Sequence, residues 1–402
     1  MVFLALVLFL LWPFGALIFS FKNYSSAWTK NIIWAFVIFY GYNFVLFNET
    51  MDANRLKEKF EFFHYADLNF SGVINYFFLD NKQGVDIIQP IILYLTSLFT
   101  TDFQVLMAVL AGIMGYFYSR NICYLLDRTE GKVKSYNYMI VWVFLFVVAF
   151  WQINGFRFWA SAHILFYALI PFLYEGSKRR FWLLPFIPLL HFAYLFPLVV
   201  FVGFLLVRNK PKLAYYAFIV TFFLGTISTE AIGNVLLQIL PSNFEHKIAA
   251  YTSADYAEEV NAAQESMSAL LRRLMFFFVN VYFLVLYTKY RAKINLDINL
   301  KQFFTFCLCI MAAGNFASII PSGNRFLFVS ALFSLSFLFF YIQRYPVEGR
   351  LKLVLQLGLP FLLLASLGYI RIGLNTINEL VVIGNPIALF FVDSGKALIE
   401  WF

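Results

Sequence analysis

Asn154-Gly-Phe-Arg-Phe-Trp-Ala160 opens an apolar run that closes at the basic cluster Lys178-Arg-Arg180. The run is long enough to cross a hydrocarbon layer of about 30 Å. Basic clusters mark the cytoplasmic ends of membrane spans, so the pattern predicts a helix with Arg157 at its outer boundary. A charge close to the bilayer core costs about 2.5–3.5 kcal/mol on insertion scales, and such residues are usually kept for a function.

The composition of the whole chain agrees with a membrane protein. Hydrophobic residues make up 62% of the 402 positions, charged residues make up 13%, and the mean hydropathy is +0.75. These values predict an all-α polytopic membrane protein with one integral membrane domain over residues 1–402. The net charge of +8 is dispersed in short clusters between apolar runs, which argues against nucleic acid as a partner. The cysteines show neither disulfide nor zinc spacing, and nucleotide-binding glycine motifs are missing, so we expect no metal and no other cofactor.

We expect about twelve transmembrane crossings, with both termini outside. Val2–Ser20 lacks a basic leader region and a small-residue cleavage site, so we interpret it as a first span rather than a signal peptide. Residues 181–207 are interrupted by prolines and have basic residues at both flanks, which predicts a hairpin with His191 near its outer turn. The other predicted spans are Asn31–Phe47, Phe103–Ser119, Tyr138–Trp151, Phe158–Tyr174, Leu213–Ile227, Leu274–Thr288, Phe303–Ile320, Phe326–Ile342 and Leu351–Ile370.

Two sizeable outer loops are predicted. The first, residues 48–102, contains an amphipathic helix with Leu56, Phe60 and Phe63 on one face, which is expected to lie in the headgroup plane. The same loop contains Ile87–Phe99, an apolar segment too short to span, which we interpret as interfacial or re-entrant. The second loop, residues 228–271, is polar and acidic. Because the inner loops are short, we expect the functional site to face outward.

Arginines near the outer ends of spans form the main group of candidate site residues. A guanidinium group matches phosphate oxygens with two parallel donors and stays charged at any relevant pH, so several converging arginines suit a lipid-linked pyrophosphate. The alternatives are snorkelling to the interface and pairing with a loop carboxylate. Arg157 and Arg325 follow glycine-containing turns, and for these two we favour a catalytic as well as a binding role. The candidate arginines are Arg55, Arg157, Arg272, Arg273, Arg325 and Arg371.

Three other side chains are candidates for proton transfer or substrate binding. Asp52 lies where the second span meets the first outer loop; it is a candidate general base, and the alternatives are a helix N-cap or a partner for Arg55. Glu230 opens the second loop and is a further candidate for either role. His191 is interpreted as a proton acceptor or substrate donor, or alternatively as a structural histidine in the proline-broken backbone. His163 is expected to be a packed polar residue.

Several short motifs follow one another along the chain. They are Asn154–Ala160, Leu190-His191-Phe192 and Gly323-Asn324-Arg325-Phe326, together with Asp52 and Gln89-Pro90. In these motifs the chain resembles the EpsG family of Wzy-type polysaccharide polymerases, and the resemblance covers most of its length. It departs from the family pattern after His191, where Phe192-Ala193 replaces the frequent Ser or Thr.

The resemblance implies a GT-C-like membrane fold and a metal-independent glycosyltransferase activity. Such an enzyme joins oligosaccharide repeat units carried on undecaprenyl pyrophosphate into O-antigen, capsule or exopolysaccharide. It lies in the bacterial inner membrane with its active side facing the periplasm or outside, and its partners include membrane lipid and a chain-length regulator. In this reaction fixed arginines stabilise the leaving pyrophosphate, and a base accepts the proton of the acceptor hydroxyl.

Two other classes of function are alternatives. A GT-C glycosyltransferase or a glycan ligase would also use a polyprenyl-linked donor, but a GT-C sugar transferase normally shows an acidic pair in its first outer loop, where Asp52 stands alone. A flippase or another transporter of lipid-linked oligosaccharides is expected to show inverted repeats and charges along a midplane path. The sequence has no internal repeat, and its boundary arginines gather on one side, which favours the polymerase.

Overall fold

The computed structural model describes residues 1–47, 51–66, 70–75, 86–129, 131–223, 267–320, 322–387 and 396–401. Within these residues the regular structure is helical, apart from isolated β-bridges, which confirms the all-α prediction. The helices in chain order are α1 (Val2–Leu11), α2 (Pro13–Lys22), α3 (Thr29–Tyr42), α4 (Asp52–Tyr65), α5 (Phe70–Asn75), α6 (Ile88–Ser97), α7 (Phe103–Leu126), α8 (Ser135–Val147), α9 (Phe156–Glu175), α10 (Phe186–Leu190), α11 (Leu195–Val207), α12 (Pro211–Phe223), α16 (Met267–Val285), α17 (Arg291–Ile294), α18 (Ile298–Ala317), α19 (Arg325–Arg344), α20 (Gly349–Leu374) and α21 (Glu379–Ile383).

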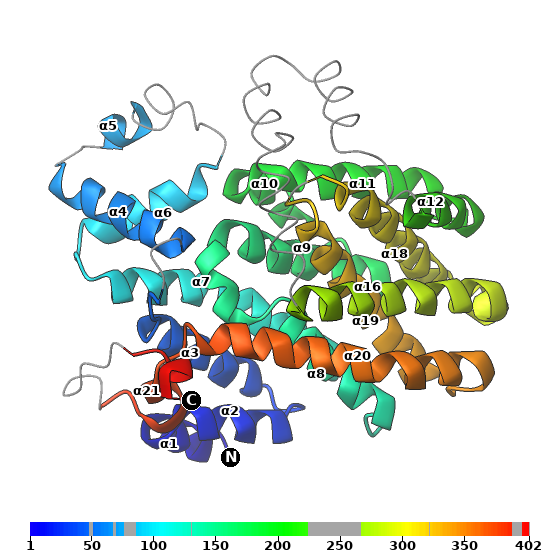
Figure 1. Cartoon of the computed structure of the whole chain (residues 1–402), viewed down its shortest axis with the longest axis horizontal. Helices are drawn as coiled ribbons and strands as arrows, with labels where there is room; N and C mark the ends of the chain where they lie inside the picture. Colours follow the sequence, from blue (N-terminus) through cyan, green and yellow to red (C-terminus); the bar gives the residue numbers. More distant parts are fainter. Residues whose placement is uncertain are drawn as a thin grey trace.

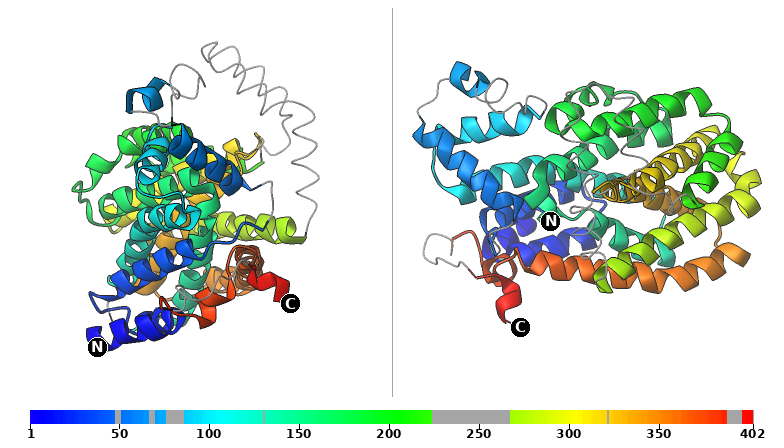
Figure 2. Two further views of the ribbon diagram at one scale, coloured as in Figure 1. Left: turned by 90° about the vertical axis from the view of Figure 1, so that its left-hand side faces the viewer. Right: turned by 45° about the horizontal axis from the view of Figure 1, so that its top comes forward.

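The long helices form one bundle, and many of them run close to the horizontal direction of Figure 1. Helices α4, α5 and α6 lie at the left end in that view, and α12 lies toward the right end. Figure 2 views the same bundle from the α4 end and from above. The helix α19 passes through the interior and is buried from Val329 to Ile342. The site described below therefore sits on a helical scaffold with a large apolar core.

Six helical stretches in the described residues are long and apolar enough to cross a membrane, as expected of a polytopic membrane protein. One of them, Ser135–Glu175, includes the break between α8 and α9 and so contains two helices. Several shorter apolar helices, such as α11 and α12, accompany them. The count of about twelve crossings stays a prediction.

The first predicted span is wrong in one respect: Val2–Ser20 forms two helices, α1 and α2, instead of one. Pro13 has no amide hydrogen and its ring clashes with the preceding turn, so the first helix ends before it. A residue that precedes proline is pushed out of the helical region, and Trp12 has φ −157° and ψ 86°. The indole N–H of Trp12 donates to the carbonyl oxygen of Val382 at 2.6 Å, which ties the break to α21.

The predicted hairpin over residues 181–207 is confirmed. The chain passes through α10, changes direction at His191, whose backbone is extended (φ −151°, ψ 112°), and returns as α11. The rings of Phe181 and Phe201, one from each arm, lie 5.7 Å apart, and both contact the ring of Phe172 in α9. Because Phe172 lies in the second half of α9, the turn at His191 is brought back toward the start of α9.

The end of the bundle opposite to that turn collects the basic clusters. Arg128, after α7, forms an ion pair with Glu175 at the end of α9. The Nζ of Lys134, before α8, donates to the carbonyl oxygen of Ile342 in the last turn of α19 at 2.8 Å. These contacts place four helix ends on one side, while Arg157 starts α9 on the other. This is the separation that the charge pattern predicted; which end faces the cytoplasm stays a prediction.

The amphipathic helix of the first loop is α4. Its apolar residues Leu56, Phe60 and Phe63 are buried, and the ring of Phe63 lies 6.5 Å from that of Tyr94 in α6. Protein therefore covers this face, and its placement in the headgroup plane stays a prediction. Of the second loop, residues 228–266 lie outside the described residues, and the remainder, Met267–Leu271, already belongs to α16.

Candidate active site

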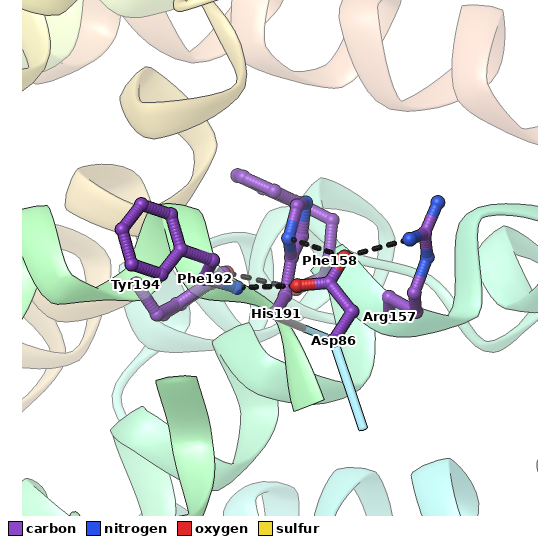
Figure 3. Close-up of polar contacts among 6 residues, drawn as sticks. All are labelled: Asp86, Arg157, Phe158, His191, Phe192 and Tyr194. Atoms are coloured by element: carbon purple, nitrogen blue, oxygen red, sulfur yellow. Dashed lines mark hydrogen bonds and ion pairs between the residues drawn. The ribbon is translucent and has the colours of Figure 1, made fainter. Parts of the chain in front are cut away.

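Asp86 lies between Arg157 and His191 (Figure 3). Its Oδ2 is 2.6 Å from Nη1 of Arg157 and 3.5 Å from Nδ1 of His191, and its Oδ1 accepts the backbone N–H of Phe192 at 2.8 Å. The contact to His191 is longer than a well-formed hydrogen bond, so it is mainly electrostatic. The side chain of Asp86 is 17% exposed and that of Arg157 is 46% exposed. The carboxylate is thus sheltered, and the guanidinium reaches the surface.

The start of α9 is fixed to the first outer loop by the Asn154-Gly155 turn. The side-chain oxygen of Asn154 accepts the backbone N–H of Ala53 in the first turn of α4 at 2.9 Å. A Cβ on Gly155 would come within 3.0 Å of the Trp159 ring, which favours glycine at this point. The motif recognised in the sequence therefore holds α4 next to the turn that precedes Arg157.

The turn of the hairpin contacts Asp86 and α9 from the other side. The backbone of His191 is extended, and the N–H of the next residue, Phe192, donates to Asp86. The hydroxyl of Tyr194 donates to the carbonyl oxygen of Phe158 at 2.8 Å, which fixes the hairpin to α9. The Phe158 ring packs edge-on against the His191 ring, with centroids 5.5 Å apart. Three segments distant in sequence thus meet at Asp86.

Asp86 is held in its charged form. Burial alone raises the pKa of this carboxyl, but the contacts with His191, the Phe192 amide and Arg157 outweigh burial and bring the pKa below its ordinary value. A carboxylate with a lowered pKa accepts protons weakly. Asp86 is therefore suited to orient Arg157 and His191 rather than to act as a base.

Lys59 adds a further positive charge from α4. Burial lowers the pKa of Lys59, and repulsion from Arg157 and Arg55 lowers it further. Both arginines are therefore close enough to Lys59 to act on its charge. Lys59 and Arg55 are four residues apart, so they project from the same face of α4.

Arg325 lies in the same region, next to the ring of Phe158. Its guanidinium carbon lies 5.8 Å from the centroid of the Phe158 ring, at cation–π distance. The adjacent Phe326 ring packs 5.5 Å from that of Phe158. Of the predicted site residues, the structure therefore brings together Arg55, Arg157, His191 and Arg325.

The remaining predicted site residues are Asp52, next to Arg55, and four residues from other parts of the chain. Asp52 is exposed in the first turn of α4, where its carboxylate lies 3.9 Å from the guanidinium of Arg55. Arg272, in α16, acts electrostatically on Tyr369 of α20. The last three are Arg273, in α16; Arg371, exposed in α20; and Glu230, outside the described residues.

His163 is buried, as predicted. Its ring Nε2 lies 3.0 Å from the carbonyl oxygen of Val148, and its own carbonyl oxygen accepts the side-chain N–H of Asn121 at 2.9 Å. It joins α7, α9 and the chain after α8 and takes no part in the cluster.

Sequence reasoning missed Asp86 and Lys59. Asp86 ends the polar loop just before the short apolar helix α6, where a retained charge close to the membrane is a signal of function. Lys59 has the weaker signal of sharing a helix face with Arg55. Neither signal predicts that the two side chains lie near Arg157, because their proximity depends on the tertiary fold.

The family model of the EpsG family matches residues 69–370, which is well over half of the chain. The matched range includes Asp86, Arg157, His191 and Arg325 and leaves out α4. No curated protein and no solved structure matches the chain. The GT-C-like fold therefore stays a prediction.

Proposed function

This chain belongs to the EpsG family of Wzy-like polysaccharide polymerases, and we propose that it joins oligosaccharide repeat units carried on undecaprenyl pyrophosphate. A membrane-embedded polymerase of the glycosyltransferase type is what the family implies. We further propose that the donor is a lipid pyrophosphate and that the reaction needs no metal. We also propose that the site faces outward from the inner membrane. The observation that carries it is the group of cations, Arg55, Lys59, Arg157 and Arg325, around one turn at one end of the bundle.

The cations match the charge that develops in the reaction. As the acceptor hydroxyl oxygen attacks the anomeric carbon of the donor, the bond to the pyrophosphate oxygen breaks and the electron pair stays on the leaving group. Fixed donors aimed at that oxygen stabilise the transition state more than the ground state. We assign this role to Arg157, with Lys59 and Arg325 binding the remaining phosphate oxygens.

In the resting protein, the Asp86 carboxylate occupies the donors that we expect a phosphate oxygen to use during the reaction. The carboxylate accepts from Arg157 and from the Phe192 amide, two donors that a phosphate oxygen can also use. Since Arg157 is half-exposed, a lipid pyrophosphate can reach it from the membrane surface without opening the core. Asp86 keeps the guanidinium oriented until then.

A base must take the proton from the hydroxyl group of the acceptor sugar. His191 has one ring nitrogen beside the Asp86 carboxylate, which stabilises the imidazolium that forms when the other nitrogen takes a proton. We therefore propose His191 as the base. Asp52, the base candidate from the sequence, is exposed beside Arg55 at the start of α4, a position that fits its alternative role as partner of Arg55.

The test is reconstitution of the purified protein in vesicles with a lipid-pyrophosphate-linked repeat unit. We expect a ladder of longer glycans and the release of one free lipid pyrophosphate for each bond formed. Arg157→Ala should lower the rate of both by about 10²–10³, while the control Arg208→Ala, exposed at the opposite end of the bundle, should retain both. Transfer of lipid-linked substrate across the vesicle membrane without bond formation would support the flippase alternative instead.

A further inference from the structure

A second cationic site lies at the end of the bundle that carries the basic clusters. A cavity of about 660 Å³ opens between the α11–α12 turn and the segment that follows α16. The residues that line it are Asn209, Lys210, Pro211, Lys212, Leu213, Tyr216, Tyr287, Arg291 and Asn295. Three of these are cations and none is acidic, so the cavity attracts anions.

Tyrosine rings hold two of the cations in place. Nζ of Lys212 lies 5.8 Å from the centroid of the Tyr216 ring, and the guanidinium carbon of Arg291 lies 5.6 Å from that of Tyr287. The Tyr287 ring is itself stacked on Tyr215 of α12, with centroids 3.7 Å apart. Tyr287 and Arg291 thus form a fixed wall across from Lys212.

The backbone around Tyr287 is specialised. Residues Leu286–Tyr290 form a π-helical turn between α16 and α17, and such turns are frequent at functional sites. In the described part of the chain, Lys210, Lys212 and Arg291 are not paired with carboxylates. The nearby Asp297 is already used, because it caps α18 and pairs with Arg344. The cavity therefore keeps its positive charge for a ligand.

Apolar surface continues from the cavity along two helices. On α12, Leu213 in the cavity wall and Val220 two turns further on are exposed. On α11, Leu206, Val202 and Val199 are exposed on one face. A cationic cavity at a helix end, next to apolar faces that run away from it, has the form of a headgroup site with acyl-chain contacts.

We propose that this cavity binds the phosphate headgroup of an anionic phospholipid of the surrounding bilayer, with Lys210, Lys212 and Arg291 contacting the phosphate. The charge pattern predicts this end as cytoplasmic, and basic pockets between helices on that side bind anionic headgroups. The site is at the opposite end from Asp86 and does not depend on the proposed reaction.

The test is native mass spectrometry of the purified protein titrated with phosphatidylglycerol and, separately, with zwitterionic phosphatidylcholine. We expect wild type to retain phosphatidylglycerol preferentially. The triple variant Lys210→Gln, Lys212→Gln, Arg291→Gln should bind it at least about tenfold more weakly, since each basic residue near an anionic surface adds about fivefold in affinity. The matched control Lys289→Gln, Arg350→Gln, Lys352→Gln removes the same charge at the same end, outside the cavity, and should bind like wild type.

Several outcomes would overturn the proposal. Equal loss in the triple variant and its control would mean that only net charge matters. Inorganic phosphate that competes at the same concentration as phosphatidylglycerol would reduce the site to a phosphate site, and tighter binding of a polyprenyl phosphate would make it a substrate site. If the triple variant fails to fold, the double variant Lys210→Gln, Lys212→Gln, both exposed at the helix turn, replaces it and should give an intermediate loss.

Discussion

Arg157 and Asp86 form a 2.6 Å ion pair across 71 residues of sequence. The pair joins the start of α9 to the segment before α6. His191, in the turn of the hairpin, contacts the same Asp86 carboxylate from a third segment. Since α9 is anchored at its far end by the ion pair between Arg128 and Glu175, the guanidinium is presented by a helix that is held at both ends. A charged group held in this way needs little reorganisation during a reaction, which is the condition for electrostatic catalysis.

Replacing Arg157 separates catalysis from folding. Arg157→Ala should leave an inserted protein that accumulates single repeat units on lipid, with a rate loss of about 10²–10³ as for other oxyanion donors. Arg157→Lys keeps the charge but loses the two-pronged geometry, so it should retain only part of the activity. Polymer length on gels and protein abundance, both measured in the same membranes, check this. A normal ladder from well-expressed Arg157→Ala would refute the assignment.

The base can be identified by comparing His191 with Asp52. A positioned base contributes about 10²–10⁴ in rate, so His191→Gln should lose this much in the initial rate of polymerisation. Asp52→Asn should stay near wild type, because that carboxylate is exposed and lies beside Arg55. The opposite order of effects would return the role to Asp52.

The hairpin and the boundary arginine could be predicted from the sequence because their signals are local. Prolines and two basic flanks define the turn at His191, and the Lys178-Arg-Arg180 cluster fixes the direction of α9. The break at Trp12 also had a local signal in Pro13, which the uninterrupted hydropathy of Val2–Ser20 concealed.

Other features depended on contacts between distant segments. The apolar face of α4 could have met lipid or protein, and only packing against α6 decides between them. Asp86 resembles other loop acids until the fold brings it to Arg157 and His191. The position of a span boundary is encoded locally, whereas the composition of the site is not.

Acid should weaken the fold through Asp86. The pKa of Asp86 is lowered in the folded protein, so its ionised form stabilises the fold above the ordinary aspartate value of about 3.9. That contribution is lost as the pH falls through the lower folded value. Thermal unfolding in detergent between about pH 6 and 3 should therefore show a smaller acid-induced loss for Asp86→Asn than for wild type. Glu58→Gln, at an exposed position of α4, is the control, and an Asp86→Asn curve parallel to wild type would contradict this prediction.

The two ends of the bundle can be assigned to the two sides of the membrane by cysteine labelling. In a background without the native cysteines, Asn324→Cys marks the end with Arg325, and Leu296→Cys marks the end with the basic clusters; both positions are exposed. An impermeant thiol reagent added to intact spheroplasts should label the first and leave the second until the membrane is opened. Labelling of Leu296→Cys alone would invert the topology and the proposed outward-facing site with it.

Lys59 provides the sharpest test of the cluster, because its neighbour on the same helix is a matched control. If Lys59 binds a phosphate oxygen, Lys59→Gln should lower kcat/KM by about 10- to 100-fold, the usual effect of losing a hydrogen bond to a charged group. Lys57→Gln removes the same charge two residues earlier, where Nζ lies 4.0 Å from Glu61, and should stay within about twofold of wild type. The lowered pKa of Lys59 adds a pH signature: wild-type activity should fall on the alkaline side before an ordinary lysine deprotonates, whereas Lys59→Arg, which stays charged, should hold its activity to higher pH. Equal losses in Lys57→Gln and Lys59→Gln would mean that only the net charge of α4 matters. Lys59 would then no longer be assigned to the proposed site.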